Sequence, residues 1–131
     1  MKKETRNVIL AFVFTAIAVI VVFVLLPSSS RNPVDTQHEK FGRKAVEIAD
    51  SFLDFEISAQ EAYSQIIDLY YAKSAMPEVS KNDKYYKGND SVETEVFLLS
   101  CDLGDAYYKS DASEVLSSRN KLAETLGLSS R

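Results

Sequence analysis

Residues 8 to 26 read VILAFVFTAIAVIVVFVLL, and this stretch decides how the rest of the chain is organised. It contains no charged residue, and its only polar side chain is the hydroxyl of Thr15. A helix over these positions would be about 28 Å long, close to the hydrocarbon core of a bilayer at about 30 Å. Because a backbone in lipid must satisfy its own hydrogen bonds, the stretch predicts a single N-terminal transmembrane helix.

Positive charge precedes this stretch, at Lys2, Lys3 and Arg6, whereas only Arg31 follows it closely. The positive-inside bias therefore predicts a short cytoplasmic tail over residues 1–7 and a C-terminal domain outside the membrane. We expect a single-pass signal-anchor in a bacterial cytoplasmic membrane, with an extracytoplasmic domain. The membrane itself is then the first predicted partner.

A cleaved signal peptide is the alternative interpretation of the same stretch. Ser28 and Ser30 are small enough to form a cleavage site, and cleavage after Ser30 would release a secreted domain. However, the apolar region of a signal peptide spans about 7–15 residues, and this one is longer. The length favours an anchor that is retained.

Residues 27–37, PSSSRNPVDTQ, are rich in serine and proline and predict an irregular stalk. The remaining residues, 38–131, are enough for one small domain. Their apolar residues recur at helical spacing, which predicts an all-α fold: an antiparallel bundle of three to four helices. We expect helices at about 38–56, 58–76, 90–109 and 111–126.

Local signals mark several ends of these helices. Ser58 and Glu61 have the spacing of a capping box, and Gly127 is a natural C-terminal cap. Asp90 is the predicted N-cap of the third helix, and Asp111 that of the fourth. The first helix is predicted to place its apolar residues, up to Phe55, on one face.

Two apolar stripes run along the predicted helix 90–109. Val92, Val96, Leu99, Leu103 and Ala106 step by three and four residues, while Phe97, Cys101 and Tyr108 form a second stripe. A helix that is apolar on two sides is expected to lie between neighbours, so we expect this helix to be central and Cys101 to be buried.

Composition excludes several classes of site. From Asn32 onward the chain has 11 basic and 18 acidic side chains, a net charge of −7, which argues against nucleic acid as a partner. With one cysteine, Cys101, and one histidine, His38, we expect no disulfide, no metal site and no cofactor. We see no catalytic constellation and expect a protein that is not an enzyme.

Tyrosine has an unusual distribution, with adjacent pairs at 70–71, 85–86 and 107–108. Neighbouring residues on a helix point about 100° apart, so we expect Tyr70 and Tyr107 to pack inward and Tyr71 and Tyr108 to be exposed. Tyr85 and Tyr86 fall in a polar loop. Exposed tyrosines are favoured at interfaces, which leads to one hypothesis for a contact surface. Its candidate residues are Tyr71, Tyr85, Tyr86 and Tyr108.

Arg119 lies within the apolar stripe of the last predicted helix. Its stem can pack while the guanidinium reaches solvent, or the guanidinium can pair with a carboxylate of another helix. The first arrangement is the expectation.

The sequence thus indicates a membrane-tethered helical interaction module facing outward, with another membrane or envelope protein as its partner. Two alternatives remain open. The first is binding of a small molecule or cell-wall saccharide on a tyrosine-lined surface, and the second is a hydrolase that uses carboxylates.

Overall fold

Four helices form between residues 36 and 126 of the computed structural model, which describes residues 31–131. They are α2 (Thr36–Leu53), α3 (Ala59–Lys73), α4 (Tyr86–Lys109) and α5 (Ser113–Leu126). The predicted tail 1–7 and transmembrane helix 8–26 lie outside the described residues. Among helices that are described, none combines the length and apolar character needed to cross a bilayer.

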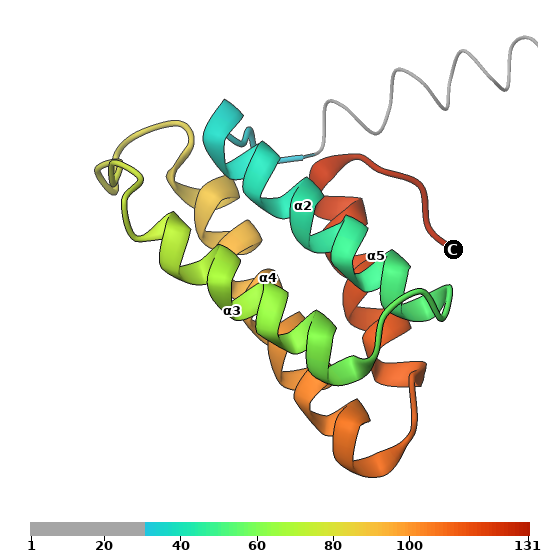
Figure 1. The fold of residues 1–131 in the computed structure, drawn as a ribbon. Helices are drawn as coiled ribbons and strands as arrows, with labels where there is room; N and C mark the ends of the chain where they lie inside the picture. Colours follow the sequence, from blue (N-terminus) through green and yellow to red (C-terminus); the bar gives the residue numbers. More distant parts are fainter. Residues whose placement is uncertain (1–30) are drawn as a thin grey trace, which may run out of the picture. The chain divides into compact units, whose positions relative to one another are not determined.

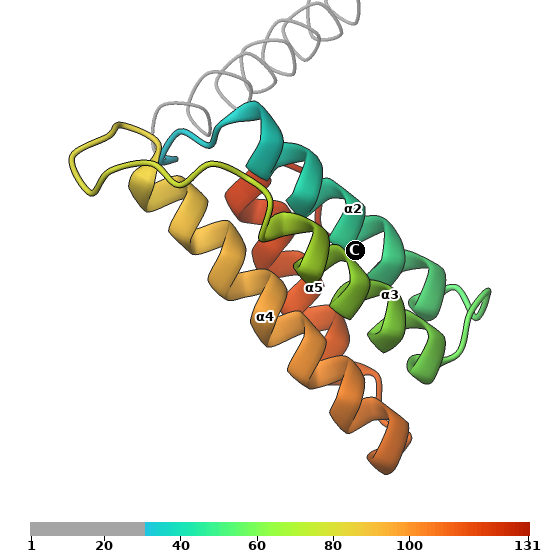
Figure 2. The ribbon, with the colours of Figure 1, turned by 60° about the vertical axis from the view of Figure 1, so that its left-hand side comes forward.

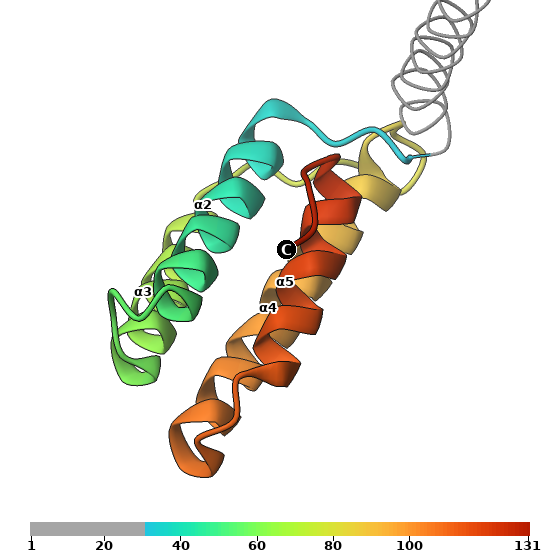
Figure 3. The ribbon, with the colours of Figure 1, turned by 90° about the vertical axis from the view of Figure 1, so that its right-hand side faces the viewer.

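The four helices run alternately up and down, so that the α2–α3 hairpin packs on the α4–α5 hairpin (Figures 1 and 2). Figure 3 shows the two hairpins as two layers, with the end of α4 extending past the α2–α3 turn. Both α2 and α4 contact each of the other helices, whereas α3 and α5 do not meet each other in this part of the chain. The predicted all-α class is confirmed for residues 31–131, which contain no β-strand.

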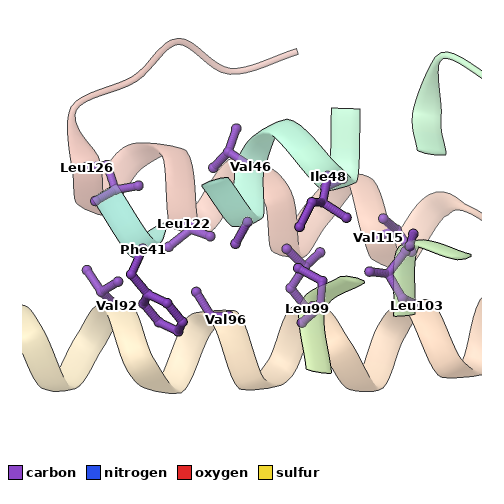
Figure 4. Close-up of a cluster of buried hydrophobic side chains, with 14 of the residues drawn as sticks. Phe41, Val46, Ile48, Val92, Val96, Leu99, Leu103, Val115, Leu122 and Leu126 are labelled. Carbon is purple, nitrogen blue, oxygen red and sulfur yellow. The ribbon is translucent and has the colours of Figure 1, made fainter. Parts of the chain in front are cut away.

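The core lies between the two hairpins and contains side chains from all four helices (Figure 4). Burying each large apolar side chain stabilises the fold by about 1.5–3 kcal/mol. The predicted stripe from Val92 to Ala106 is buried. The prediction that α4 alone is central is wrong, because α2 also contacts each of the other helices and the second apolar stripe of α4 is exposed. The largest fully buried side chains are those of Phe41, Ile66, Leu99, Leu103 and Leu122.

The predicted stalk 27–37 is wrong over its last residues, because α2 begins at Thr36 and Asp35 is held by α4; residues 27–30 lie outside the described residues. The N-cap of α2 is Asp35, whose carboxylate accepts from the backbone N–H of His38 at 2.8 Å. Asn89 on α4 accepts from the Asp35 backbone N–H at 3.1 Å and donates to Asp35 Oδ2 at 2.8 Å. Val34 also packs against the core. Residues 32–35 are therefore part of the domain.

Helix α4 begins at Tyr86, four residues before the predicted cap Asp90. The carboxylate that binds the backbone before this helix is that of Asp83, not Asp90: Asp83 Oδ1 accepts from the Tyr85 backbone N–H at 2.8 Å. Gly88 explains why the chain approaches so closely here, since a Cβ atom at this position would lie 2.1 Å from the Pro33 carbonyl oxygen. The sequence pattern could not reveal this contact.

The other helix ends follow the predicted signals more closely. Ser58 caps α3 by accepting from the Glu61 N–H at 3.1 Å, and Gly127 ends α5 with a φ of 74°. α3 ends at Lys73 rather than near residue 76, because the next residues form tighter i to i+3 bonds. α5 begins at Ser113, whose N–H binds Asp111 Oδ1 at 2.9 Å. α2 ends at Leu53, before Phe55. The prediction that Phe55 lies on the core face is wrong, because its side chain is 95% exposed.

Candidate functional site

An aromatic groove of about 820 Å³ lies between α3 and α4. This volume is typical of the 300–1,000 Å³ of small-ligand sites, as an order of magnitude. Gln60, Ser100 and Asp105 add polar groups to a lining that is otherwise largely apolar. The aromatic residues that line this groove are Tyr63, Tyr70, Tyr71, Phe97, Tyr107 and Tyr108.

Each wall of the aromatic groove is one stripe of a helix. The α3 wall contains Tyr63, Ile67, Tyr70 and Tyr71, and the α4 wall contains Phe97, Cys101, Gly104 and Tyr108. Positions spaced by three, four and seven share one side of a helix, so each stripe is continuous.

Gly104 lines the groove opposite the Tyr63 ring. A Cβ atom at this position would lie 3.7 Å from Tyr63 Cε2, an ordinary contact distance, so the space beside the ring could hold a methyl group.

Tyr70 forms the inner edge of the groove and is fixed by the core. Its ring packs edge-on against Phe41, with 5.7 Å between centroids, and against Phe97 at 6.4 Å. Its hydroxyl donates to the Glu93 carbonyl oxygen at 2.5 Å. Burial, together with the nearby charge of Glu93, raises the pKa of Tyr70 to about 12. Tyr70 is therefore a neutral, rigid part of the groove.

The outer edge of the groove exposes a large aromatic surface. Tyr108 is 84% exposed and Tyr71 75%, and Phe97 and Tyr107 are more than half exposed. The rings of Tyr107 and Tyr108 pack edge-to-face at 5.0 Å. Isolated exposed aromatic residues are ordinary, but several that line one depression mark an interaction site more strongly.

The structure brings together two of the four predicted contact residues. Tyr71 and Tyr108 line the aromatic groove from opposite walls, as the hypothesis of a tyrosine-lined surface requires. Tyr85 and Tyr86 do not join them. They are half-buried at the start of α4, because this helix begins earlier than predicted.

Sequence reasoning missed most of the groove residues. The second stripe of α4 predicts that Phe97 and Cys101 are buried, and Tyr107 is predicted to pack inward, yet all three are exposed. Tyr63 was not singled out and is 42% exposed. The second stripe of α4 was the available signal, since an apolar stripe looks the same whether it faces a helix or a groove.

Three carboxylates converge near the end of α4. Oxygen atoms of Asp102, Asp105 and Glu114 all lie within 4.8 Å of one another, and Asp105 also lines the aromatic groove. Ser118 donates its hydroxyl hydrogen to Asp102. We call these three side chains the acidic cluster. Exposed acidic groups are common without an ion, so the cluster by itself assigns no metal.

His38 lies in a second, more polar depression of about 570 Å³, which Tyr86 and Glu93 also line. Its ring nitrogens face two carboxylates: Nδ1 is 2.9 Å from Asp35 Oδ1, and Nε2 is 2.9 Å from Glu93 Oε1. Lys73 binds the same Glu93 oxygen at 3.0 Å. Burial opposes ionisation of Glu93, but these bonds outweigh it and lower its pKa. Cys101 lines the aromatic groove, so His38 and Cys101 do not share a site.

Arg119 is buried and paired, which corrects the prediction that its guanidinium reaches solvent. Its side chain binds Asp50 on α2 through two nitrogen atoms and donates to the Ser129 carbonyl oxygen at 2.6 Å. Arg131 also binds Asp50, at 3.1 Å. These bonds among Asp50, Arg119 and Arg131 join α2, α5 and the C-terminal tail, so they are a structural feature of the bundle.

Glu95 is the acid that the hydrolase alternative must consider, because burial raises its pKa. Thr125 on α5 donates to its Oε1 at 2.9 Å, and Oε2 has no hydrogen-bond partner in this part of the chain. Glu95 does not line either depression. It therefore does not provide the pair of acids facing each other in a cleft that such chemistry needs.

Comparison of the chain with protein-family models, with curated proteins and with solved structures finds no match.

Proposed function

We propose that this chain is a membrane-tethered binding module whose aromatic groove recognises another protein outside the cytoplasmic membrane. The apolar run of residues 8–26 and the charges before it support the tether and its orientation. The observation that carries the binding role is the aromatic groove, which exposes Tyr71 and Tyr108 on opposite walls of a single depression.

The groove suits protein recognition for a physical reason. Tyrosine and phenylalanine provide large contact area with few rotatable bonds, so they lose little conformational entropy on binding. Tyr70, held by Phe41 and Glu93, keeps the inner edge of the groove in place before any partner arrives. A preformed site loses less free energy to ordering.

Site-specific photocrosslinking of the full chain in intact cells tests this proposal. A photoreactive phenylalanine replaces Tyr71 or Tyr108, and a control chain carries it at the exposed Glu47 on α2. We expect discrete protein adducts from the two groove positions and none of these from position 47. Alkylation of Cys101, which lines the groove, should suppress the adducts.

Protease treatment of the same cells tests the tether. We expect the domain after residue 31 to be cleaved while the cells are intact and to remain with the membrane fraction before cleavage. Release into the medium of a chain that begins near Ser30 would instead support the secreted form. Identical adducts from the groove and from position 47 would contradict the binding role.

A small molecule or cell-wall saccharide is the second candidate, because the tyrosines line a concave groove rather than a flat patch. Calorimetric titration of the unlabelled chain with soluble cell-wall fragments tests this candidate. A saturable heat of binding, lost in Tyr71→Ser and Tyr108→Ser, would favour this ligand over a protein partner.

A further inference from the structure

The aromatic groove has an uneven charge distribution. Asp105 is the one charged residue in its lining, and no lysine or arginine of residues 31–131 lines it. Asp105 belongs to the acidic cluster, whose other members are Asp102 and Glu114. One end of the groove is therefore negative, and the rest is aromatic.

No ion pair between a basic residue of residues 32–131 and the acidic cluster is present. Lys73, which reaches over the Tyr70 ring at 5.7 Å, is already paired with Glu93 at 3.0 Å. Three carboxylates this close repel one another, so a cation placed among them lowers the electrostatic energy. Their charge is thus available to a partner.

The aromatic pair beside the cluster adds a second attraction for a cation. Tyr107 and Tyr108 follow Asp105 on α4, and both rings line the groove. A lysine or arginine side chain over a tyrosine face gains about 0.5–2 kcal/mol from the cation–π interaction. Its aliphatic stem can pack against the same rings.

On the basis of the proposed function, we propose that the groove binds a basic segment of the partner protein, in which lysine or arginine alternates with apolar side chains. The cationic group lies at the acidic cluster, and the apolar side chains pack between Tyr71 and Phe97. Charge complementarity with Asp105 and Glu114 selects this partner over acidic or neutral segments.

Selection from a random displayed peptide library tests the inference, with the full chain in lipid nanodiscs as the target. Each enriched peptide is synthesised and measured against four chains. These are the unmodified chain, a chain alkylated at Cys101, the double variant D105N and E114Q, and a control double variant E47Q and D68N. The two double variants change net charge equally, and all four substituted residues are exposed.

We expect enrichment of lysine and arginine in peptides whose binding is lost on alkylation of Cys101. The D105N and E114Q variant should bind them about tenfold more weakly, whereas the control variant should bind them as the unmodified chain does. Added salt should weaken binding to the unmodified chain.

Three results would overturn the inference in distinguishable ways. Peptides that lose binding on alkylation of Cys101 but contain no basic residues, or bind both double variants equally, would refute the basic partner and leave the proposed function intact. Peptides whose binding is unchanged by alkylation of Cys101 would refute both the basic partner and the proposed function. Self-association of the unmodified chain through the groove, measured by sedimentation, would assign it to a second copy instead.

Discussion

The Arg119 guanidinium on α5 binds the Asp50 carboxylate on α2 in a bidentate ion pair, with Nε 2.8 Å from Oδ1 and Nη2 3.1 Å from Oδ2. Arg119 is only 7% exposed. This two-point pair joins the first and the last of the described helices. Loss of Asp50 would leave the buried Arg119 charge without its carboxylate, which is the costly case, whereas loss of Arg119 would leave Asp50 partly exposed and still bound by Arg131.

Replacing Arg119 by methionine keeps an unbranched apolar stem but removes the charge. Because Asp50 is partly solvated, we expect a loss of about 2 kcal/mol in the free energy of unfolding, below the range for fully buried pairs. Urea unfolding measures the loss. The control is Arg43→Met, whose exposed pair with Glu39 should contribute less than about 0.5 kcal/mol. Equal losses in the two variants would contradict the role of the buried pair.

The same pair predicts a dependence on acid. Burial raises the pKa of Asp50, but hydrogen bonds from Arg119 and Arg131 outweigh it and hold the pKa below the ordinary 3.8. A lowered carboxyl pKa stabilises the fold above pH 3.8, and this stabilisation is lost as the pH falls below that value. The stability difference between the unmodified chain and Asp50→Asn should therefore be constant near neutral pH and shrink in acid. A constant difference down to well below pH 3.8 would refute this.

Glu95→Gln should stabilise the protein at neutral pH by about 1 kcal/mol, because it removes a buried negative charge whose Oε2 atom has no hydrogen-bond partner among the described residues. Gln keeps the oxygen that accepts from Thr125. Since burial raises the pKa of Glu95 above 4.5, the unmodified chain loses stability as the pH rises through this region, and the gain should vanish below pH 4.5.

Glu93 provides the matched control for Glu95, two residues earlier on α4. Its pKa is lowered by His38 and Lys73 despite burial, so Glu93→Gln should destabilise at neutral pH. Denaturant titrations at several pH values compare the variants. Stabilisation by both substitutions, or by neither, would show that charge burial is not the cause.

Two glycines of α4 should respond oppositely to alanine. At Gly104 the added Cβ lies at ordinary contact distance, 3.7 Å from Tyr63, so Gly104→Ala should stabilise by about 0.5–1 kcal/mol. At Gly88 the Cβ would lie 2.1 Å from the Pro33 carbonyl oxygen, so Gly88→Ala should cost about 1–3 kcal/mol. Thermal unfolding followed by circular dichroism measures both. Stabilisation by Gly88→Ala would mean that residues 32–35 are not held against α4.

Phe55 occupies the turn between α2 and α3 with a φ of 61° and is 95% exposed. A left-handed backbone costs a non-glycine residue about 1–2 kcal/mol, and the exposed ring contributes little packing in return. Phe55→Gly should raise the free energy of unfolding by about 1 kcal/mol. Phe55→Ala retains the Cβ and should not, so a gain of equal size in both variants would point to the ring rather than the backbone.

The sequence alone predicts the helices and most of the buried face, because helical periodicity and caps depend on residues three or four positions apart. Ser58 and Gly127 show this for helix ends, and the stripe from Val92 to Ala106 shows it for the core. The apolar run at 8–26 likewise predicts a membrane span from its length and composition. None of these inferences requires knowledge of which helix packs where.

The aromatic groove and the Arg119–Asp50 pair were decided by tertiary packing. Phe97, Cys101 and Tyr108 form a stripe as regular as the buried one, and only the position of α3 leaves it facing a groove. Arg119 meets Asp50 across 69 residues of sequence, and Asn89 holds Asp35 across 54. The local sequence pattern carries no information about which residues so far apart in the sequence come into contact. Whether a side chain is buried depends on the neighbouring helix as well as on the residue itself.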